Sequence, residues 1–158
     1  MISQSIIWNL CADAIEKSAD VGEVLSQYEK PLRVYVGHDA ASVIEQSDCP
    51  IISISPMDTP VDFGNFATER NISILVRFAL RDDVIIDDGV RSTFRGMIAL
   101  DSLGAAIVVA LLGISGLGDE LIKADLTLES TDNNPLCTGR IECVFSCKRG
   151  LAFEPSVT

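Results

Sequence analysis

Basic residues are scarce in this chain of 158 residues. Twelve Lys and Arg stand against 23 Asp and Glu, which gives a formal net charge of -11. Such a charge repels the phosphate backbone at long range instead of attracting it. The composition therefore argues against tight binding of nucleic acid, and we expect no specific nucleic-acid partner.

Long apolar runs are missing as well. No window reaches the roughly 18 continuous apolar residues of a membrane-spanning helix, and no basic segment precedes the first apolar residues as it does in a secretion signal. The chain also lacks internal repeats and low-complexity tracts, so residues 1–158 are expected to form a single domain. These absences predict a soluble protein, made in the cytoplasm, without a membrane partner.

Histidines and paired cysteines are too few to suggest a catalytic or metal site. His38 is the only histidine, and none of the five cysteines forms a C-x-x-C pair, so no zinc site is expected. Cys143 and Cys147 fall on the apolar side of a predicted strand, where a thiol packs as a small apolar group. A nucleophile and base pair of His38 with Ser42 or Cys49 is conceivable. A lone loop histidine is more often solvated, however, and we expect neither an enzyme nor a cofactor.

Strict alternation of apolar and polar residues is the strongest pattern present. It occurs in two segments, with apolar residues at Ile72, Ile74, Val76, Phe78 and Leu80, and again at Ile141, Cys143, Phe145 and Cys147. Each segment is typical of a strand with one apolar and one polar face. The first of these two segments predicts a long strand over 70–81, the third in the chain. Shorter strands are predicted over 32–36, 49–55 and 122–129.

Helical spacing appears in three further segments. Apolar residues recur every three or four positions from Ile2 to Ile15. Asp20 and Glu23 have the spacing of a capping box for a second, short helix. A third helix is predicted over 97–112, ended by Gly113. Its second half, 103–112, carries no charged side chain, so it should be covered on more than one side.

The order of the main elements is helix, strand, strand, strand, helix, strand, strand. This order predicts an α+β fold with a mainly antiparallel sheet, two main helices packed on one face of it, and a polar second face. The connection over 57–68 is expected to lack regular structure, and residues 132–135 have a strong turn signal.

An acidic loop is predicted at 82–89, with three bulky apolar residues inside it. The acids of this loop do not have the D-x-D-x-D-G spacing of a calcium-binding loop. Alignment of Gly89 with the glycine of that motif puts Val84 and Ile86 where acids are required. The apolar residues either fold into the domain's own core or contact a neighbouring subunit. Arginines, which are enriched at protein interfaces, surround the loop. The candidate interface residues are Arg77, Arg81, Asp82, Asp83, Val84, Ile85, Ile86, Asp87, Asp88, Arg91 and Arg95.

Several local segments together resemble one protein family over nearly the full length. They are the N-terminal helical region, residues 31–37 leading to 48–52, the long third strand, Phe94-Arg95-Gly96 opening a helix, and residues 135–141 starting the last strand. In this layout the chain resembles the tail terminator proteins of tailed bacteriophages, also called tail completion proteins.

The resemblance implies a structural protein of the virion without catalytic residues. It implies a ring, typically of six copies, at the head-proximal end of the tail, which stops growth of the tail tube, offers a surface for joining the head, and lets DNA pass. The implied partners are further copies of the chain, the tail tube protein, neck or head-completion proteins, and a sheath protein if the tail is contractile. Neighbours would meet at 84–86 and at the flank of 103–112.

Three alternatives remain open. A head-tail connector or neck protein shares a small α+β architecture and ring symmetry. A protein of a bacterial injection device descended from phage tails would have the same sequence features. A small cytoplasmic enzyme would use His38 and the thiols.

Overall fold

The computed structural model describes residues 4–38, 48–57, 69–114, 119–129 and 135–148. The predicted connection over 57–68 and the predicted turn at 132–135 lie outside these ranges except for Met57 and Pro135, and Ser42 lies outside them as well.

Five strands form the main sheet, in the order β1-β2-β3-β7-β6. Their bounds are Arg33–Val36 for β1, Ile51–Pro56 for β2, Glu69–Arg81 for β3, Asp119–Glu129 for β6 and Leu136–Lys148 for β7. The pairs β2-β3, β3-β7 and β6-β7 are antiparallel, whereas β1 and β2 are parallel. A parallel pair requires a connection of about a dozen residues or more, and β1 and β2 are far enough apart in the sequence to allow it. The predicted α+β class with a mainly antiparallel sheet is confirmed.

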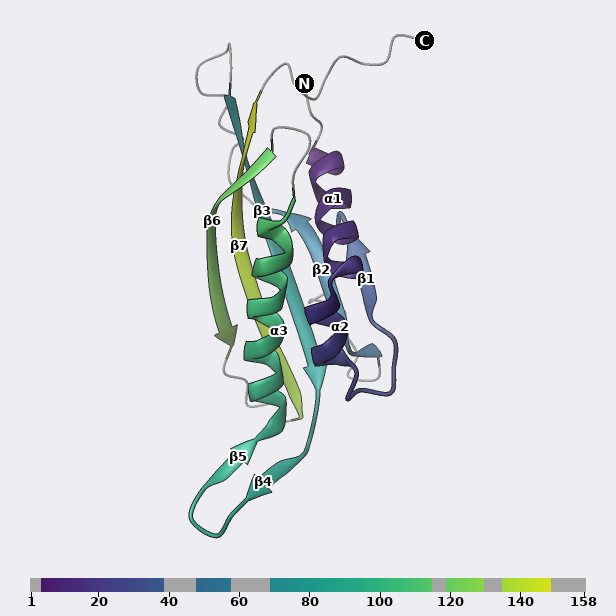
Figure 1. Cartoon of the computed structure of the whole chain (residues 1–158), viewed down its shortest axis with the longest axis vertical. Coiled ribbons are helices and arrows are strands. Elements are labelled where there is room, and N and C mark those ends of the chain that lie inside the picture. The colour runs from purple at the N-terminus through teal and green to yellow at the C-terminus, as the bar shows by residue number, and fades with distance from the viewer. Residues whose placement is uncertain (1–3, 39–47, 58–68, 115–118, 130–134, 149–158) are drawn as a thin grey trace.

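Three helices lie on one face of the sheet (Figure 1). They are α1 (Gln4–Lys17), α2 (Ala19–Leu25) and α3 (Arg95–Leu112). Helix α1 packs over β1 and β2, α3 packs over β3, β6 and β7, and α2 lies against α3. The two long helices α1 and α3 therefore cover the sheet from one side, as predicted.

The start of α2 differs from the prediction. Ser18 is its N-cap, and the Ser18 hydroxyl accepts a hydrogen bond of 3.2 Å from the backbone N–H of Val21. The predicted capping box of Asp20 and Glu23 is wrong, because Ser18 already satisfies an orphan N–H of the first turn. Helix α2 ends at Leu25, and Ser26 is its C-cap.

Helix α3 begins at Arg95, two residues earlier than predicted, and ends before Gly113 as predicted. By length and composition alone it could cross a membrane. In the fold, however, its inner side is buried, with Leu100, Leu103 and Ile107 each 0% exposed. Its apolar composition is therefore accounted for in part by the domain core.

The long alternating strands form the apolar layer under the helices. All five predicted inward residues of β3, from Ile72 to Leu80, are at most 1% exposed. Phe78 lies directly opposite Gly139 on β7, and a Cβ at Gly139 would lie 2.5 Å from the Phe78 Cζ atom. The Phe78 ring thus occupies the space that a side chain at position 139 would need. This pairing fixes the register of β3 against β7.

A β-bulge changes which residues of β6 face the core. Leu121 pairs with Phe145 and Lys123 with Val144, so Ile122 is the extra residue. Leu121 packs against the core, while Ile122 is 54% exposed. The strand predicted over 122–129 is present, but the bulge leaves its first residue exposed.

The outer face of the sheet is not polar throughout. On β2, the side chains that alternate with the core-facing ones are buried too: Ile51 is 2%, Ser53 1% and Ser55 4% exposed. Ala79, which pairs with Ile51, is 1% exposed. The predicted solvated second face is wrong for β2, which is buried on both sides.

Candidate subunit interface

A β-hairpin projects beyond the end of the main sheet, between β3 and α3 (Figure 1). Strands β4 (Ile85–Asp87) and β5 (Ser92–Phe94) pair in antiparallel fashion as a separate two-stranded sheet. The predicted irregular loop at 82–89 is therefore wrong. Residues of high β-propensity stand on both sides of Asp88-Gly89, and an Asp-Gly pair between such segments is a hairpin signal.

Two acids hold the turn of the hairpin together. The Asp87 Oδ1 atom accepts a bond of 2.8 Å from the Gly89 N–H. The Asp88 Oδ1 atom accepts bonds of 2.9 Å from Val90 N–H and 2.7 Å from Arg91 N–H. The bond from Arg91, and then the bond from Val90, lower the pKa of Asp88. Gly89 has a φ of +88°, which glycine adopts without strain. The two acids thus order the turn of the hairpin.

Apolar side chains on the hairpin are exposed. Ile85 is 49%, Ile86 53% and Phe94 47% exposed, and Val90 at the turn is 98% exposed. Of the two interpretations of the apolar residues at 84–86, burial in the domain's own core is wrong. Contact with a neighbouring subunit stays a prediction.

A buried carboxylate fixes the base of the hairpin. Asp82 precedes β4, and its side chain is 1% exposed. It accepts two bonds from the Arg95 guanidinium, 2.7 Å from Nε and 3.2 Å from Nη2, and a bond of 2.8 Å from the Tyr28 hydroxyl. It also accepts a bond of 3.0 Å from the Val84 N–H. Because Arg95 follows β5 and Tyr28 follows α2, one carboxylate ties both legs of the hairpin to the helical layer.

The charges at this base are stable near neutral pH. Burial alone disfavours the charged form of Asp82, but the bonds from Arg95, Val84 and Tyr28 outweigh it and lower the pKa of Asp82. Burial, and then the hydrogen bond to Asp82, raise the pKa of Tyr28. The carboxylate therefore stays ionised and the phenol stays a donor. We call Tyr28, Asp82 and Arg95 the hairpin clamp.

The remaining candidate residues lie on different surfaces. Asp83 and Arg91 are exposed on the hairpin, and Arg81 is exposed at the end of β3. Arg77 lies on the outer face of the sheet, where its Nη1 atom is 3.2 Å from Glu129 Oε1. The structure thus brings the candidates from Asp82 to Arg95 together, while Arg77 belongs to the sheet. The clamp partner Tyr28 was missed, because no local pattern connects it with a residue 54 positions away.

The residues considered for catalysis do not come together within the described part of the chain. His38 is exposed beyond the end of β1. Cys49 is buried, and burial raises its pKa to about 11, so the thiol is protonated at neutral pH. Cys143 is buried, as expected of a core thiol, and so are Cys11 and Cys137, whereas the Cys147 side chain lies outside the described residues. Among the described residues, no group of His, Cys, Asp and Glu could hold a metal ion.

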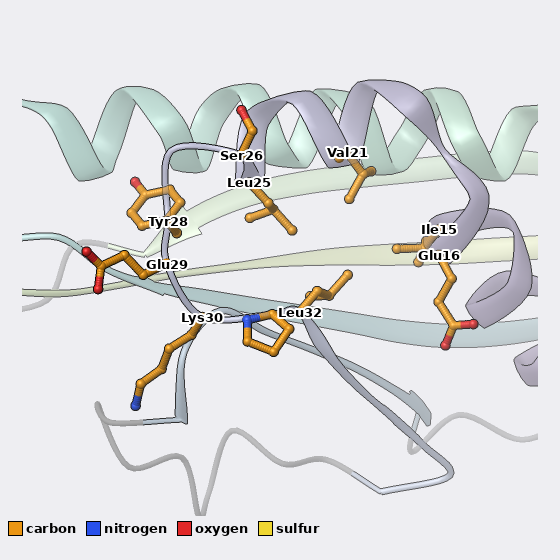
Figure 2. Close-up of a pocket in the computed structure, with 11 residues that line it drawn as sticks. Ile15, Glu16, Val21, Leu25, Ser26, Tyr28, Glu29, Lys30 and Leu32 are labelled. Carbon is orange, nitrogen blue, oxygen red and sulfur yellow. The ribbon is translucent and has the colours of Figure 1, made fainter.

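A groove of about 360 Å³ lies between α2 and the start of β1 (Figure 2). Val21, Leu25 and Leu32 turn toward this space, whereas Glu16 and Lys30 turn away from it. A binding site for a small molecule usually adds a few converging polar groups to such an apolar lining. The labelled charged side chains in Figure 2 do not converge in that way, so we do not assign a site to this groove.

Comparisons with known proteins give no match of sequence and a distant likeness of structure. No protein-family model and no curated protein matches the sequence. A solved structure of similar shape is a chain in the virion of a native gene transfer agent particle. It is 14% identical with a TM-score of 0.49, over 87% of this chain and 90% of that chain.

Proposed function

We propose that this chain is a structural virion protein that forms a ring at the head-proximal end of a phage tail tube. The ring ends polymerisation of the tube, provides the surface for joining the head or neck, and leaves a channel for DNA. The proposal combines the sequence's resemblance to tail terminator proteins with the surface chemistry of the fold.

The single observation that carries the proposal is the projecting hairpin with its exposed apolar side chains. A hairpin of two three-residue strands is marginal by itself, yet this one is fixed to the body by a buried carboxylate with four hydrogen bonds. Val90 at its tip is 98% exposed. An ordered apolar projection is costly to leave in water and is typical of a protein contact.

The charge of the chain suits a channel for DNA. With a net charge of -11, copies arranged in a ring create a negative potential inside it. That potential repels the phosphate backbone, so DNA passes without binding the wall. A protein that had to grip DNA would need the opposite sign.

The test is to mix the purified chain with tail tubes and, separately, with emptied heads of the same particle, and to image both by electron microscopy. We expect rings at one end of the tubes. Decoration of the heads alone supports a head-tail connector instead, and decoration of neither contradicts both structural roles. Unchanged assembly after substitution of His38 with Ala would remove most of the support for the enzyme alternative.

A hairpin variant makes the same test specific. Substitution of both Ile85 and Ile86 with Asp should reduce tube capping without unfolding the domain, because these side chains are about half exposed. The matched control is Ile6→Asp, which changes an apolar side chain of similar exposure, 40%, on α1. A hairpin variant that caps as well as the control contradicts the proposal.

A further inference from the structure

The main sheet has two free edges in the described part of the chain. Strands β1 and β6 stand at opposite ends of the sheet (Figure 1), and no other strand in the described ranges pairs with the outer side of either. A free edge presents unpaired backbone N–H and C=O groups with which another strand can pair. Bulges and charged side chains commonly protect such edges, so a stretch without them is a candidate interface.

Strand β6 is protected over only part of its length. The bulge at Ile122 and the exposed charges of Lys123 and Asp125 all precede Leu126. Residues 126–129 contain neither a bulge nor a proline and pair regularly with β7. Strand β1, with 4 residues, is also free of bulges and prolines. The open part of β6 therefore has the same length as β1.

The two open stretches lie at the same level of the sheet. Followed through successive paired residues, the row that begins at Val36 on β1 ends at Leu126 on β6. The row that begins at Arg33 likewise ends at Glu129. In a ring whose axis follows the strands, rotation without a shift therefore brings 126–129 of one copy beside β1 of the next.

Strand direction also suits this contact. Strands β1, β2 and β7 run in one direction, and β3 and β6 run in the other. All copies in a ring have the same orientation along its axis. Strand β6 of one copy is therefore antiparallel to β1 of the next copy, as are most neighbours within the sheet.

The backbone groups on the free side of β1 can be identified. The N–H groups of Arg33 and Gly37 donate to backbone carbonyls on the β2 side. Successive residues of a strand direct their backbone groups to opposite sides. The N–H and C=O groups of Val34 and Val36 therefore point outward from the free edge.

The same alternation identifies the outward groups of β6. The Met57 N–H donates to the Ser73 carbonyl, which shows which residues of β2 and β3 exchange hydrogen bonds. Continued through the paired residues of β3, β7 and β6, the alternation leaves the groups of Leu126 and Leu128 on the free edge. The outward groups of β1 and β6 thus fall in the same two rows, and each such pair can exchange both of its hydrogen bonds.

Apolar side chains face each other across this contact on the helical side. Val34 and Leu128 pack against the core, and the Leu126 Cδ1 atom is 2.8 Å from the place that a Cβ at Gly104 of α3 would take. Val36 is 39% and Leu126 37% exposed, since each lies at an edge without a neighbouring strand. In the common rows Val36 meets Leu126, so each covers the other.

Charges are complementary on the opposite face. The Arg33 guanidinium carbon is 5.5 Å from the centre of the Tyr35 ring. Glu129 is on the same face of the sheet, where it forms an ion pair with Arg77. In the common rows Arg33 is opposite Glu129, and opposite charges in such positions stabilise a strand pair. A shift of two residues would place Arg33 opposite Thr127 instead, and a shift of one would reverse the faces.

We infer that β1 of one copy pairs in antiparallel fashion with residues 126–129 of β6 in the next copy, Val36 opposite Leu126 and Arg33 opposite Glu129. This inference rests on the proposed ring and specifies a contact within it. The contact is heterologous, because β1 and β6 differ, so its repetition closes a ring when the rotation between copies closes. The five-stranded sheet then continues from copy to copy without a free edge.

Disulfide cross-linking of the double variant Tyr35→Cys, Thr127→Cys tests the register. These two residues form a pair without hydrogen bonds between them, so their Cα atoms should be about 4.5 Å apart, within the range that a disulfide spans. Oxidation should produce a ladder of covalent multimers on a denaturing gel. The matched control combines Tyr35→Cys with Lys123→Cys, on the same face of β6 but four residues away, and the wild type is the blank for the native cysteines.

The control and the wild type should stay without cross-links, with circular dichroism as the check on folding of every chain. A folded double variant that does not cross-link, or a control that cross-links equally well, would overturn the inference. Covalent dimers of the single variant Thr127→Cys would overturn it too, because they would show that β6 pairs with a second β6.

Two substitutions of Val36 test the backbone bonds separately from the side chain. Val36→Ala and Val36→Pro both shorten the apolar side chain, but only proline removes the outward N–H, a change that an edge strand tolerates. By analytical ultracentrifugation up to millimolar concentration, the proline variant should associate about tenfold more weakly than the alanine variant, as loss of a backbone hydrogen bond implies. Equal association of the two variants, or a monomeric wild type, would contradict the pairing.

Tail tubes separate this inference from the proposed function. If the double variant forms covalent rings that never bind a tube, the strand pairing stands and the function is wrong. If the double variant caps tubes and still does not cross-link on them, the function stands and the strand pairing is wrong.

Discussion

Replacement of Asp82 with Asn tests how the hairpin is held. The substitution keeps the size of the side chain and removes its charge. It leaves the Arg95 guanidinium, now at 2.7 and 3.2 Å from a neutral amide, without its counter-ion. The Tyr28 hydroxyl also loses a charged acceptor at 2.8 Å. We therefore expect both the domain and the hairpin to become less stable.

The magnitude follows from burial. Breaking a fully buried ion pair costs about 3–5 kcal/mol. The Asp82 side chain is 1% exposed, but that of Arg95 is 38% exposed, so water can solvate the guanidinium after the change. This discount leaves an expected loss of about 2–3 kcal/mol in the free energy of unfolding.

The assay is urea denaturation of the wild type, Asp82→Asn and the control Asp83→Asn at pH 7, with hydrogen exchange of the hairpin amides. Asp83 is the exposed neighbour, so the control should change stability by less than about 0.5 kcal/mol. The Arg95 N–H, which donates to the Val84 carbonyl, should exchange faster in Asp82→Asn. A loss below about 0.5 kcal/mol, with unchanged exchange, would refute the clamp.

The pH dependence gives an independent check. The pKa of folded Asp82 is lowered, so its contribution to stability is present above the unfolded pKa of 3.8 and is lost as the pH falls through the folded value. The stability difference between the wild type and Asp82→Asn should therefore stay constant from pH 7 to pH 5 and shrink below about pH 4. A difference that shrinks near pH 6 would contradict the assigned cause.

Three further predictions concern the same clamp and the core. Tyr28→Phe removes one bond to Asp82 and should cost about 1–2 kcal/mol in urea denaturation; an additive loss in the double variant with Asp82→Asn would argue against a shared network. Gly139→Ala puts a methyl group against the Phe78 ring and should cost about 1–3 kcal/mol, part of which Phe78→Leu in the same chain recovers; no loss would contradict the tight pairing. Burial raises the pKa of Cys143 from 9.0 to about 12. Between pH 9 and pH 11 the thiol ionises in the unfolded chain but not in the folded one, so the free energy of unfolding should fall by about 2–3 kcal/mol relative to a Cys143→Val variant. Equal pH profiles of the two chains would contradict this.

The parts of the fold that were predictable are those with one-sided burial. The residues of β3 and β7 that face the helices are buried at every second position, and burial on one face leaves a period of two in the sequence. Helix α3 was found for a similar reason, because its inner residues recur at helical spacing. Burial on both faces leaves no such period, which is why the buried outer side of β2, at Ser53 and Ser55, was not foreseen.

The candidate interface was located in the sequence, but its structure was not predicted. Apolar residues between acids marked 82–89 as unusual, and the structure places them on an exposed hairpin. The Asp88-Gly89 pair was the available hairpin signal. The clamp left no signal, because Tyr28, Asp82 and Arg95 meet only after α2, β3 and α3 have packed together.

Cryo-electron microscopy of tail tubes mixed with the wild-type chain tests the central claim most directly. We predict one closed ring at a single end of each tube, with the hairpin of every copy in contact with a neighbouring copy. Tubes without a ring, or a ring whose hairpins extend into solvent, would contradict the account.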